Sequence, residues 1–171
     1  MINALNHFKK IDSELITFSD DLDGLRKVPE NIPNDKVLHD NIGKPLTSIP
    51  DPFGKFESFG RHNNEMLKKF LKSFNFNFNF KSSTENYKSG VFNESLLQVL
   101  EKYDDIMNII LPTLRDERRK TYCPFLPICP ETGKVLEIPL IEINKEKGKV
   151  IFENNGKKLE TSILDGNCKL Q

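Results

Sequence analysis

The residues from Leu15 to Asn34 read LITFSDDLDGLRKVPENIPN, and this stretch decides how the front of the chain folds. Its first apolar and β-branched residues predict a strand over residues 14–18. Three aspartates, Asp20, Asp21 and Asp23, follow directly, and two prolines interrupt regular structure further on. Because ligands of open α/β sheets bind beyond the carboxyl ends of strands, these aspartates are candidate site residues.

The acidic cluster has two physical explanations. Three carboxylates within four residues repel one another, so an ammonium group or Mg²⁺ placed among them would relieve the repulsion. Aspartates that follow a strand also form turns and helix caps, and spacing alone favours this second explanation. On the residues alone, both explanations stay open.

Composition limits the class of protein. The 171 residues contain 25 Lys plus Arg and 25 Asp plus Glu, so contact with nucleic acid must come from local clusters of charge. No apolar run is long enough to cross a membrane, and the first residues lack the apolar core of a secretion signal, so we expect a cytoplasmic protein. The odd cysteine count, Cys123, Cys129 and Cys168, predicts reduced thiols rather than a disulfide framework or a zinc site.

Hydrophobic periodicity predicts helix, strand, long loop, helix, strand, further helices and then an antiparallel meander. The front half is expected to contain an opening helix over about residues 2–11, a proline-rich loop over 29–52 with a short helix near 35–41, a helix over 59–74 and a strand over 74–80, where FNFNFNF alternates. In the back half, a short helix ends at Gly90, Asn93 is predicted to cap one long helix that stops near Pro112, and strands are expected over 135–143, 149–153 and 159–164.

A second charged cluster lies in RDERRK, which holds Arg115, Arg118, Arg119 and Lys120. Arginine suits bidentate contacts with phosphate, and the aromatic residues just beyond could add stacking. Most runs of this kind are only solvated helix faces, so this alternative also stays open. No P-loop pattern and no recognisable nucleophile arrangement occurs in the sequence.

Longer strings carry more information than these motifs. FSDDLDGLRKVPENIPN, PLTSIPDPFG, ESFGRHNNEMLKKFL, KSSTENYKSGVFNESLLQVLEKYDDIMNIILPTLRDERRKTYCPFLPICPETGKVL and the terminal GNCKLQ together resemble the class I lysyl-tRNA synthetases. The resemblance extends from about residue 14 to residue 171. It implies the fold class α/β, with a partial Rossmann-type catalytic fragment of one strand and a flanking helix over residues 1–50. An inserted α+β connective domain with a small antiparallel sheet follows over residues 51–171.

The resemblance also implies roles for the charged clusters. It places Asp20, Asp21 and Asp23 on the wall of the active site, where a carboxylate would meet the ammonium group of substrate lysine, and Arg26 and Lys27 near the nucleotide or the tRNA end.

Similarly, Arg115, Arg118 and Arg119 become candidates for contact with the tRNA backbone. Zinc occurs in the inserted part of some family members. Here Lys55 and Phe56 follow DPFG, and Thr132 stands where a cysteine partner of Cys129 would be needed, so we expect no metal.

The family uses ATP with Mg²⁺, lysine and tRNA(Lys). Its HIGH-type and KMSKS-type signatures, which bind ATP, do not occur in this sequence. We therefore expect a fragment of a synthetase that has no catalytic residue and no cofactor by itself, either inactive alone or assembled with the missing halves of a split enzyme. The alternatives are a stand-alone module that binds the tRNA acceptor stem and a degenerate remnant without activity. We expect no membrane and no DNA partner.

Overall fold

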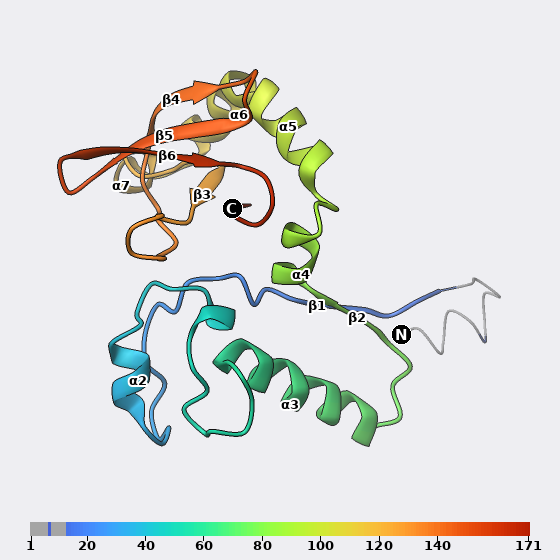
Figure 1. Cartoon of the computed structure of the whole chain (residues 1–171). Coiled ribbons are helices and arrows are strands. Elements are labelled where there is room, and N and C mark those ends of the chain that lie inside the picture. Colours follow the sequence, from blue (N-terminus) through green and yellow to red (C-terminus); the bar gives the residue numbers. More distant parts are fainter. Residues whose placement is uncertain (1–6, 8–12) are drawn as a thin grey trace.

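A computed structural model describes residue 7 and residues 13–171, and its elements form two lobes (Figure 1). In chain order they are β1 (Ile16–Ser19), α2 (Asp35–His39), the 3₁₀ turn η2 (Leu46–Ser48), α3 (Phe59–Ser73), β2 (Asn79–Ser82), α4 (Ser83–Lys88), α5 (Asn93–Glu101), α6 (Tyr103–Ile110), the 3₁₀ turn η3 (Leu111–Thr113), α7 (Asp116–Arg119), β3 (Phe125–Pro127), β4 (Leu140–Asn144), β5 (Lys149–Asn154), β6 (Lys157–Ser162) and β7 (Cys168–Leu170). The opening helix expected before residue 12 lies outside the described residues.

The strand predicted after the first residues exists, and it has a parallel partner. β1 pairs with β2 in the register Ile16 with Asn79 and Ser19 with Ser82, and α3 lies in the connection between them. Parallel strands need such a crossover because a tight turn cannot reverse the chain direction twice. The carboxyl ends of both strands therefore meet at one edge, just before the aspartate cluster and the start of α4.

The first lobe is built around α2 and α3 (Figure 1). The Ser58 side chain caps α3 by accepting a hydrogen bond from the amide of Arg61 at 3.1 Å. Phe59 on α3 packs with Leu25, Leu38 and Ile49 in a small core. The helix predicted over 59–74 and the short helix in the proline-rich loop are therefore confirmed.

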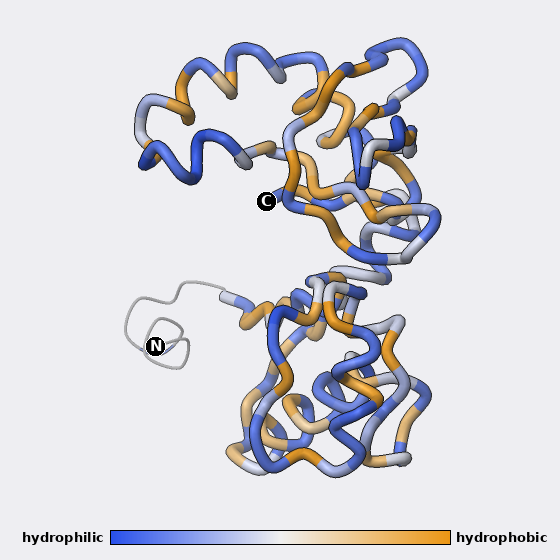
Figure 2. The backbone as a smooth tube through the Cα atoms, turned by 90° about the vertical axis from the view of Figure 1, so that its left-hand side faces the viewer, coloured by the Kyte–Doolittle hydropathy of each residue, from blue (hydrophilic) through white to orange (hydrophobic). Residues whose placement is uncertain are grey.

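The second lobe has the larger core and the antiparallel strands. Leu96 and Leu100 from α5 pack with Phe125, Val150 and Ile163 from the strand region. β4, β5 and β6 form the predicted meander, although β4 begins at Leu140 and not at residue 135, and β3 pairs with β7 in a separate two-stranded antiparallel sheet. Figure 2 shows the two lobes one above the other. The chain is thus a mixed helix and strand structure with small antiparallel sheets.

The strand predicted over 74–80 is wrong for most of its length, because β2 begins only at Asn79. Asn75 has a left-handed φ of 54°. Its amide donates to the carbonyl of Lys72, and the amide of Phe76 donates to the carbonyl of Leu71. These bonds form a Schellman cap that ends α3. The first two Phe-Asn pairs therefore belong to a helix terminus and not to a strand.

The single long helix predicted from Asn93 is also wrong, because the chain breaks at Lys102 into α5 and α6. Phe92, rather than Asn93, occupies the cap position of α5. The Asn93 side chain instead contacts Asp165, at 3.3 Å from its amide nitrogen to the carboxylate. The predicted interruption near Pro112 is confirmed, since Pro112 lies in the 3₁₀ turn η3.

No helix among residues 7 and 13–171 is long and apolar enough to span a membrane.

Candidate functional site

Asp21 lies at the centre of a buried hydrogen-bond network beyond the ends of β1 and β2. Only 2% of the residue is exposed. One carboxylate oxygen accepts from Asn64 Nδ2 at 2.7 Å and Ser82 Oγ at 2.6 Å, and the other accepts from the amide of Thr84 at 2.8 Å. These donors come from α3, β2 and α4. The side chain thus joins three elements, and at the first turn of α4 it accepts from the Thr84 amide beside the Ser82 cap, whose side chain accepts from the amide of Glu85.

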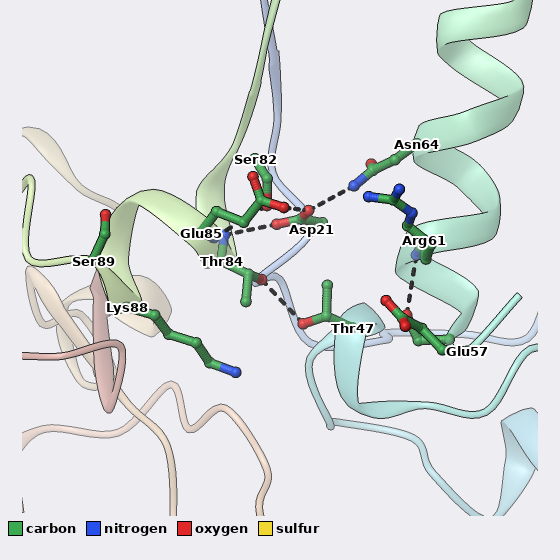
Figure 3. Close-up of a pocket in the computed structure, with 11 residues that line it drawn as sticks. Asp21, Thr47, Glu57, Arg61, Asn64, Ser82, Thr84, Glu85, Lys88 and Ser89 are labelled. Atoms are coloured by element: carbon green, nitrogen blue, oxygen red, sulfur yellow. Dashed lines mark hydrogen bonds between the residues drawn. The ribbon is translucent and has the colours of Figure 1, made fainter.

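A polar pocket of about 570 Å³ opens beside this network (Figure 3). Its wall combines hydroxyl groups with charges of both signs. The hydroxyls of Thr47 and Thr84 lie 3.0 Å apart across the wall. Arg61 pairs with Glu65 at 3.3 Å, while the side chains of Glu57, Glu85 and Lys88 form no hydrogen bond or ion pair within the described part of the chain. The remaining lining residues are Asp21, Ser58, Asn64, Ser82 and Ser89.

The other two aspartates of the cluster share an ammonium group. Lys169 on β7 lies between Asp20 and Asp23, with Nζ 2.9 Å from Asp20 Oδ1 and in hydrogen-bond contact with Asp23 Oδ1. The Lys169 side chain is 6% exposed, whereas those of Asp20 and Asp23 are 57% and 37% exposed. The cluster therefore does bind a cation, but this cation belongs to the chain itself.

Burial of Lys169 favours its neutral form, but the hydrogen bonds to Asp23 and Asp20 outweigh burial and raise the pKa of Lys169 above its ordinary value. Lys169 could not be recognised as a site residue in the sequence, because it lies 146 residues beyond Asp23 and carries no local signal. Only the tertiary structure brings Lys169 to the aspartates.

The two basic candidate groups meet at one carboxylate. Glu137 Oε2 accepts from Arg118 at 2.9 Å, and Glu137 Oε1 lies 3.7 Å from the guanidinium of Arg26. Arg26 is 77% exposed and Arg118 35% exposed at the side chain. The structure thus brings together residues 92 positions apart in sequence, on one accessible surface. Glu137 was not expected in this role.

Their neighbours have different surroundings. Arg119 donates to the carbonyl of Leu111 at 2.8 Å and to that of Pro112 at 3.1 Å, so its guanidinium is largely used to cap the end of the α6–η3 segment. Arg115 and Lys27 are exposed, and their side chains make no hydrogen bond or ion pair with other described residues. Lys27 lines a separate hollow together with Arg26 and His39.

The segment around Asp51, for which the sequence predicts no metal, is closed by protein contacts. The Asp51 side chain is 1% exposed, lies 3.1 Å from His62 Nδ1, and accepts from the amides of Lys55 and Phe56 at 2.9 and 3.0 Å. Phe53 stacks on the His62 ring at 4.3 Å between centroids. Among the residues with described positions, no group of His, Cys, Asp or Glu is arranged to hold a metal ion. The three cysteines are buried and unbridged.

Comparison with known proteins identifies the family of this chain. The family model described as tRNA synthetases class I (K) matches residues 1–171. The chain therefore belongs to the class I tRNA synthetases of the lysine type. Over 169 residues it is 51% identical to a lysine–tRNA ligase of Rickettsia bellii and 50% identical to those of Rickettsia felis and Rickettsia prowazekii.

These alignments cover 98% of this chain but 32% of each relative. The chain thus spans about a third of the length of the lysine–tRNA ligases it matches. The family resemblance noted in the sequence is confirmed over the whole chain.

Proposed function

We propose that this chain contributes to the ATP-dependent ligation of lysine to tRNA(Lys). The observation that carries the proposal is the near-complete alignment, at about half identity, with proteins named lysine–tRNA ligase. No HIGH-type or KMSKS-type signature occurs in the 171 residues. Because stabilising the charge on the ATP phosphates is a large part of adenylate formation, this chain by itself forms no lysyl-adenylate.

The parallel pair of β1 and β2 with α3 between them supports a further part of the proposal, namely that this unit is a portion of a Rossmann-type sheet. The division near residue 50 expected from the sequence would cut this unit, because α3 and β2 lie beyond it, so the proposed boundary between a catalytic part and an inserted part lies after β2. Lysine-dependent exchange between pyrophosphate and ATP tests the catalytic part directly. Robust exchange by the purified chain alone would contradict the proposed need for residues outside this sequence.

Lysine recognition is proposed for Asp20 and Asp23. The support is chemical: their carboxylates already surround one lysine ammonium, that of Lys169. Asp21, the third aspartate proposed for this role, would act by holding the turn in place, since its oxygens accept three hydrogen bonds.

Removal of the internal ammonium tests this assignment. In Lys169→Met, free lysine should raise the unfolding temperature more than norleucine, which has the same chain without the ε-ammonium. The wild-type chain, whose acids are occupied, should show a smaller difference. Equal effects of lysine and norleucine on Lys169→Met would mean that Asp20 and Asp23 serve only Lys169.

The tRNA backbone is proposed to contact the surface formed by Arg26, Arg115 and Arg118. Its support is the approach of Arg26 and Arg118 to the same carboxylate, together with the exposed position of Arg115 at the start of α7. Phosphate groups would compete with Glu137 for these guanidinium groups. Lys27 and Arg119 are also proposed to contact the tRNA. Arg119 is the weaker candidate, because its guanidinium already donates to the carbonyls of Leu111 and Pro112.

Salt dependence of tRNA binding tests this surface. Each arginine that contacts a phosphate should, when changed to alanine, weaken binding and lower the slope of log K against log salt by roughly one. Lys69→Ala, which removes an exposed cation on α3, is the matched control and should leave the slope unchanged. An unchanged slope in Arg26→Ala, Arg115→Ala and Arg118→Ala would exclude this surface.

The same measurements separate the second candidate function, a stand-alone module that binds tRNA. The clustering of Arg26 and Arg118 favours it independently of lysine recognition. Salt-sensitive tRNA binding without a lysine-specific effect in Lys169→Met would support the module and not the ligase role.

A further inference from the structure

A third hollow, of about 260 Å³, lies next to the first turn of α4. Ser82 and Thr84 line the polar pocket of Figure 3, whereas Ser83 between them lines this hollow. Its volume falls slightly below the roughly 300–1,000 Å³ of sites for drug-sized ligands. The hollow therefore suits one ring system better than a whole nucleotide.

Ser83 has an unsatisfied hydroxyl group in this hollow. The residue is 0% exposed, and its Oγ has no hydrogen-bond partner among the residues the structure describes. A buried polar atom without a partner costs about 1–3 kcal/mol, so such atoms are rare and call for an explanation. A ligand that hydrogen-bonds Ser83 would remove this cost.

Three aromatic residues, Phe18, Tyr87 and Phe92, form part of the wall of the hollow. The rings of Phe18 and Phe92 are 6.4 Å apart with an interplanar angle of 51°, and those of Tyr87 and Phe92 are 4.9 Å apart with an angle of 63°. Leu170 adds an aliphatic surface. Phe18 is 49% exposed, so part of its ring is available to an incoming group. Aromatic walls of this kind favour a planar ligand that can stack.

Two charged groups complete the hollow beside Ser83. Lys169 has three N–H donors, of which Asp20 and Asp23 take two. Asp20 uses Oδ1 for this bond, and its Oδ2 accepts no hydrogen bond within the described residues. One donor on Lys169 and one acceptor on Asp20 therefore remain in the hollow that Ser83 also lines, and the Ser83 hydroxyl can act as either.

We propose that this hollow binds a single unstacked nucleobase whose Watson–Crick edge presents an amino group beside an unprotonated ring nitrogen, that is, adenine or cytosine. The ring would lie among Phe18, Tyr87 and Phe92. Its amino group would donate to Asp20 or Ser83, and the adjacent ring nitrogen would accept from Lys169 or Ser83. Uracil, which presents a carbonyl and an N–H on this edge, reverses the pattern. The inference rests on the proposed function, because it gives the tRNA partner a base-binding site on this chain.

Binding of free nucleosides to the full chain tests the hollow without tRNA. Saturation-transfer NMR titrations should show adenosine and cytidine binding roughly tenfold more tightly than uridine, the discrimination expected when hydrogen-bonding edges mismatch. Ser83→Ala should weaken adenosine binding about fivefold, as for the loss of one hydrogen bond. Ser73→Ala, an exposed serine at the end of α3, is the matched control and should bind like the wild-type chain.

Stability measurements show whether the variants are intact. Ser83→Ala should fold with unchanged or higher stability, because it deletes a buried hydroxyl without a partner. Phe92→Leu should weaken adenosine and cytidine equally, since it removes stacking and no hydrogen bond. Equal binding of all nucleosides, or no binding by a folded wild-type chain, would overturn the proposal.

Two further experiments use tRNA. The first asks which molecule supplies the base, and the second asks whether a failure of the base-binding site would also contradict the proposed function. tRNA whose single-stranded end is masked by a complementary oligonucleotide should bind more weakly than free tRNA if the base comes from that end. Equal binding of masked and free tRNA, with nucleoside selectivity retained, would assign the hollow to a free nucleoside or nucleotide. Binding of tRNA that depends on Arg118 but not on Ser83 would contradict the base-binding site alone and leave the proposed function standing.

Discussion

At the scale of single residues, Asp21 shows how one carboxylate can hold three segments together. The substitution Asp21→Ala would leave the donors of Asn64, Ser82 and Thr84 without their acceptor. We expect the free energy of unfolding to fall by about 3 kcal/mol or more, since each buried donor without a partner costs about 1–3 kcal/mol. Denaturant unfolding followed by circular dichroism measures the change.

Glu146→Ala is the comparison for that experiment, because Glu146 is exposed and forms no ion pair with the described residues. It should change the free energy of unfolding by less than about 0.5 kcal/mol. Similar values for the two variants would contradict the structural role assigned to Asp21.

Asp51 should make the chain sensitive to acid. Burial tends to raise the pKa of Asp51, but hydrogen bonds from His62 and from the amides of Phe53, Lys55 and Phe56 lower it below its ordinary value of 3.8. A carboxyl whose pKa is lower in the folded state stabilises the fold above its unfolded pKa, and this contribution is lost as the pH falls.

The free energy of unfolding should therefore decrease as the pH falls from about 5 to about 2.5. Asp51→Asn should show a weaker pH dependence over this range, because it cannot be protonated. Parallel pH profiles for the wild-type chain and Asp51→Asn would disprove a contribution from this carboxyl.

At the scale of elements, two arginines at opposite ends of the short helix α7 are expected to have different roles. Arg119 stabilises the fold, whereas Arg115, at the cap position, is proposed to contact tRNA. Arg119 caps the α6–η3 segment through two carbonyl groups and pairs with Asp116 at 3.0 Å. We expect Arg119→Ala to lower the unfolding temperature, by an amount equal to about 1–2 kcal/mol of unfolding free energy. Arg115→Ala should leave the temperature within about 1 °C and act only on tRNA binding. Thermal melts of the two variants decide between these roles, and a greater loss of stability in Arg115→Ala would reverse them.

The elements that sequence patterns predicted well are those with strong local signals. A one-sided apolar face and the Ser58 cap define α3, and turn residues define the meander. The failures have local physical causes. Alternating Phe and Asn near residue 75 looks like a strand, but Asn75 adopts a left-handed conformation and ends a helix. The apolar pattern from residue 93 to 110 continues through Lys102, so it does not predict the break there. In the structure, Lys102 has a φ of −92° and a ψ of 15°, which separates α5 from α6.

The candidate site was predictable only in part for a similar reason. The sequence identified Asp20, Asp21 and Asp23 as a cluster, and the turn and capping explanation anticipated the buried bonds of Asp21. It could not separate the three aspartates, because Asp21 turns inward while the other two meet Lys169. Contacts between residues far apart in the chain set that difference.

At the scale of the whole molecule, Lys169 links the last strand to the loop after the first one. Its pKa is raised in the fold, so its stabilising contribution is complete below the ordinary value of 10.5 and is lost as the pH rises through the higher folded value. We expect the free energy of unfolding to fall above about pH 10.5 in the wild-type chain. Lys169→Met should show a smaller alkaline loss, measured by denaturant unfolding across the same pH range.

At neutral pH, Lys169→Met should be less stable by roughly 2 kcal/mol, a value between those of exposed and buried ion pairs. Lys158→Met, which breaks an exposed pair with Glu142, should cost less than about 1 kcal/mol. A cost for Lys169→Met no greater than that for Lys158→Met would show that the link is dispensable.

The parallel pairing of β1 with β2 and the bond from Lys169 to Asp20 set an order for folding during translation. A ribosome that has released the first strand must still add more than sixty residues before the second strand can join it. It must add 149 residues beyond Asp20 before the lysine that neutralises this acid appears. The nascent aspartates therefore stay exposed to solvent and to cellular cations until that lysine emerges, and a stall before this point would leave their charge unbalanced.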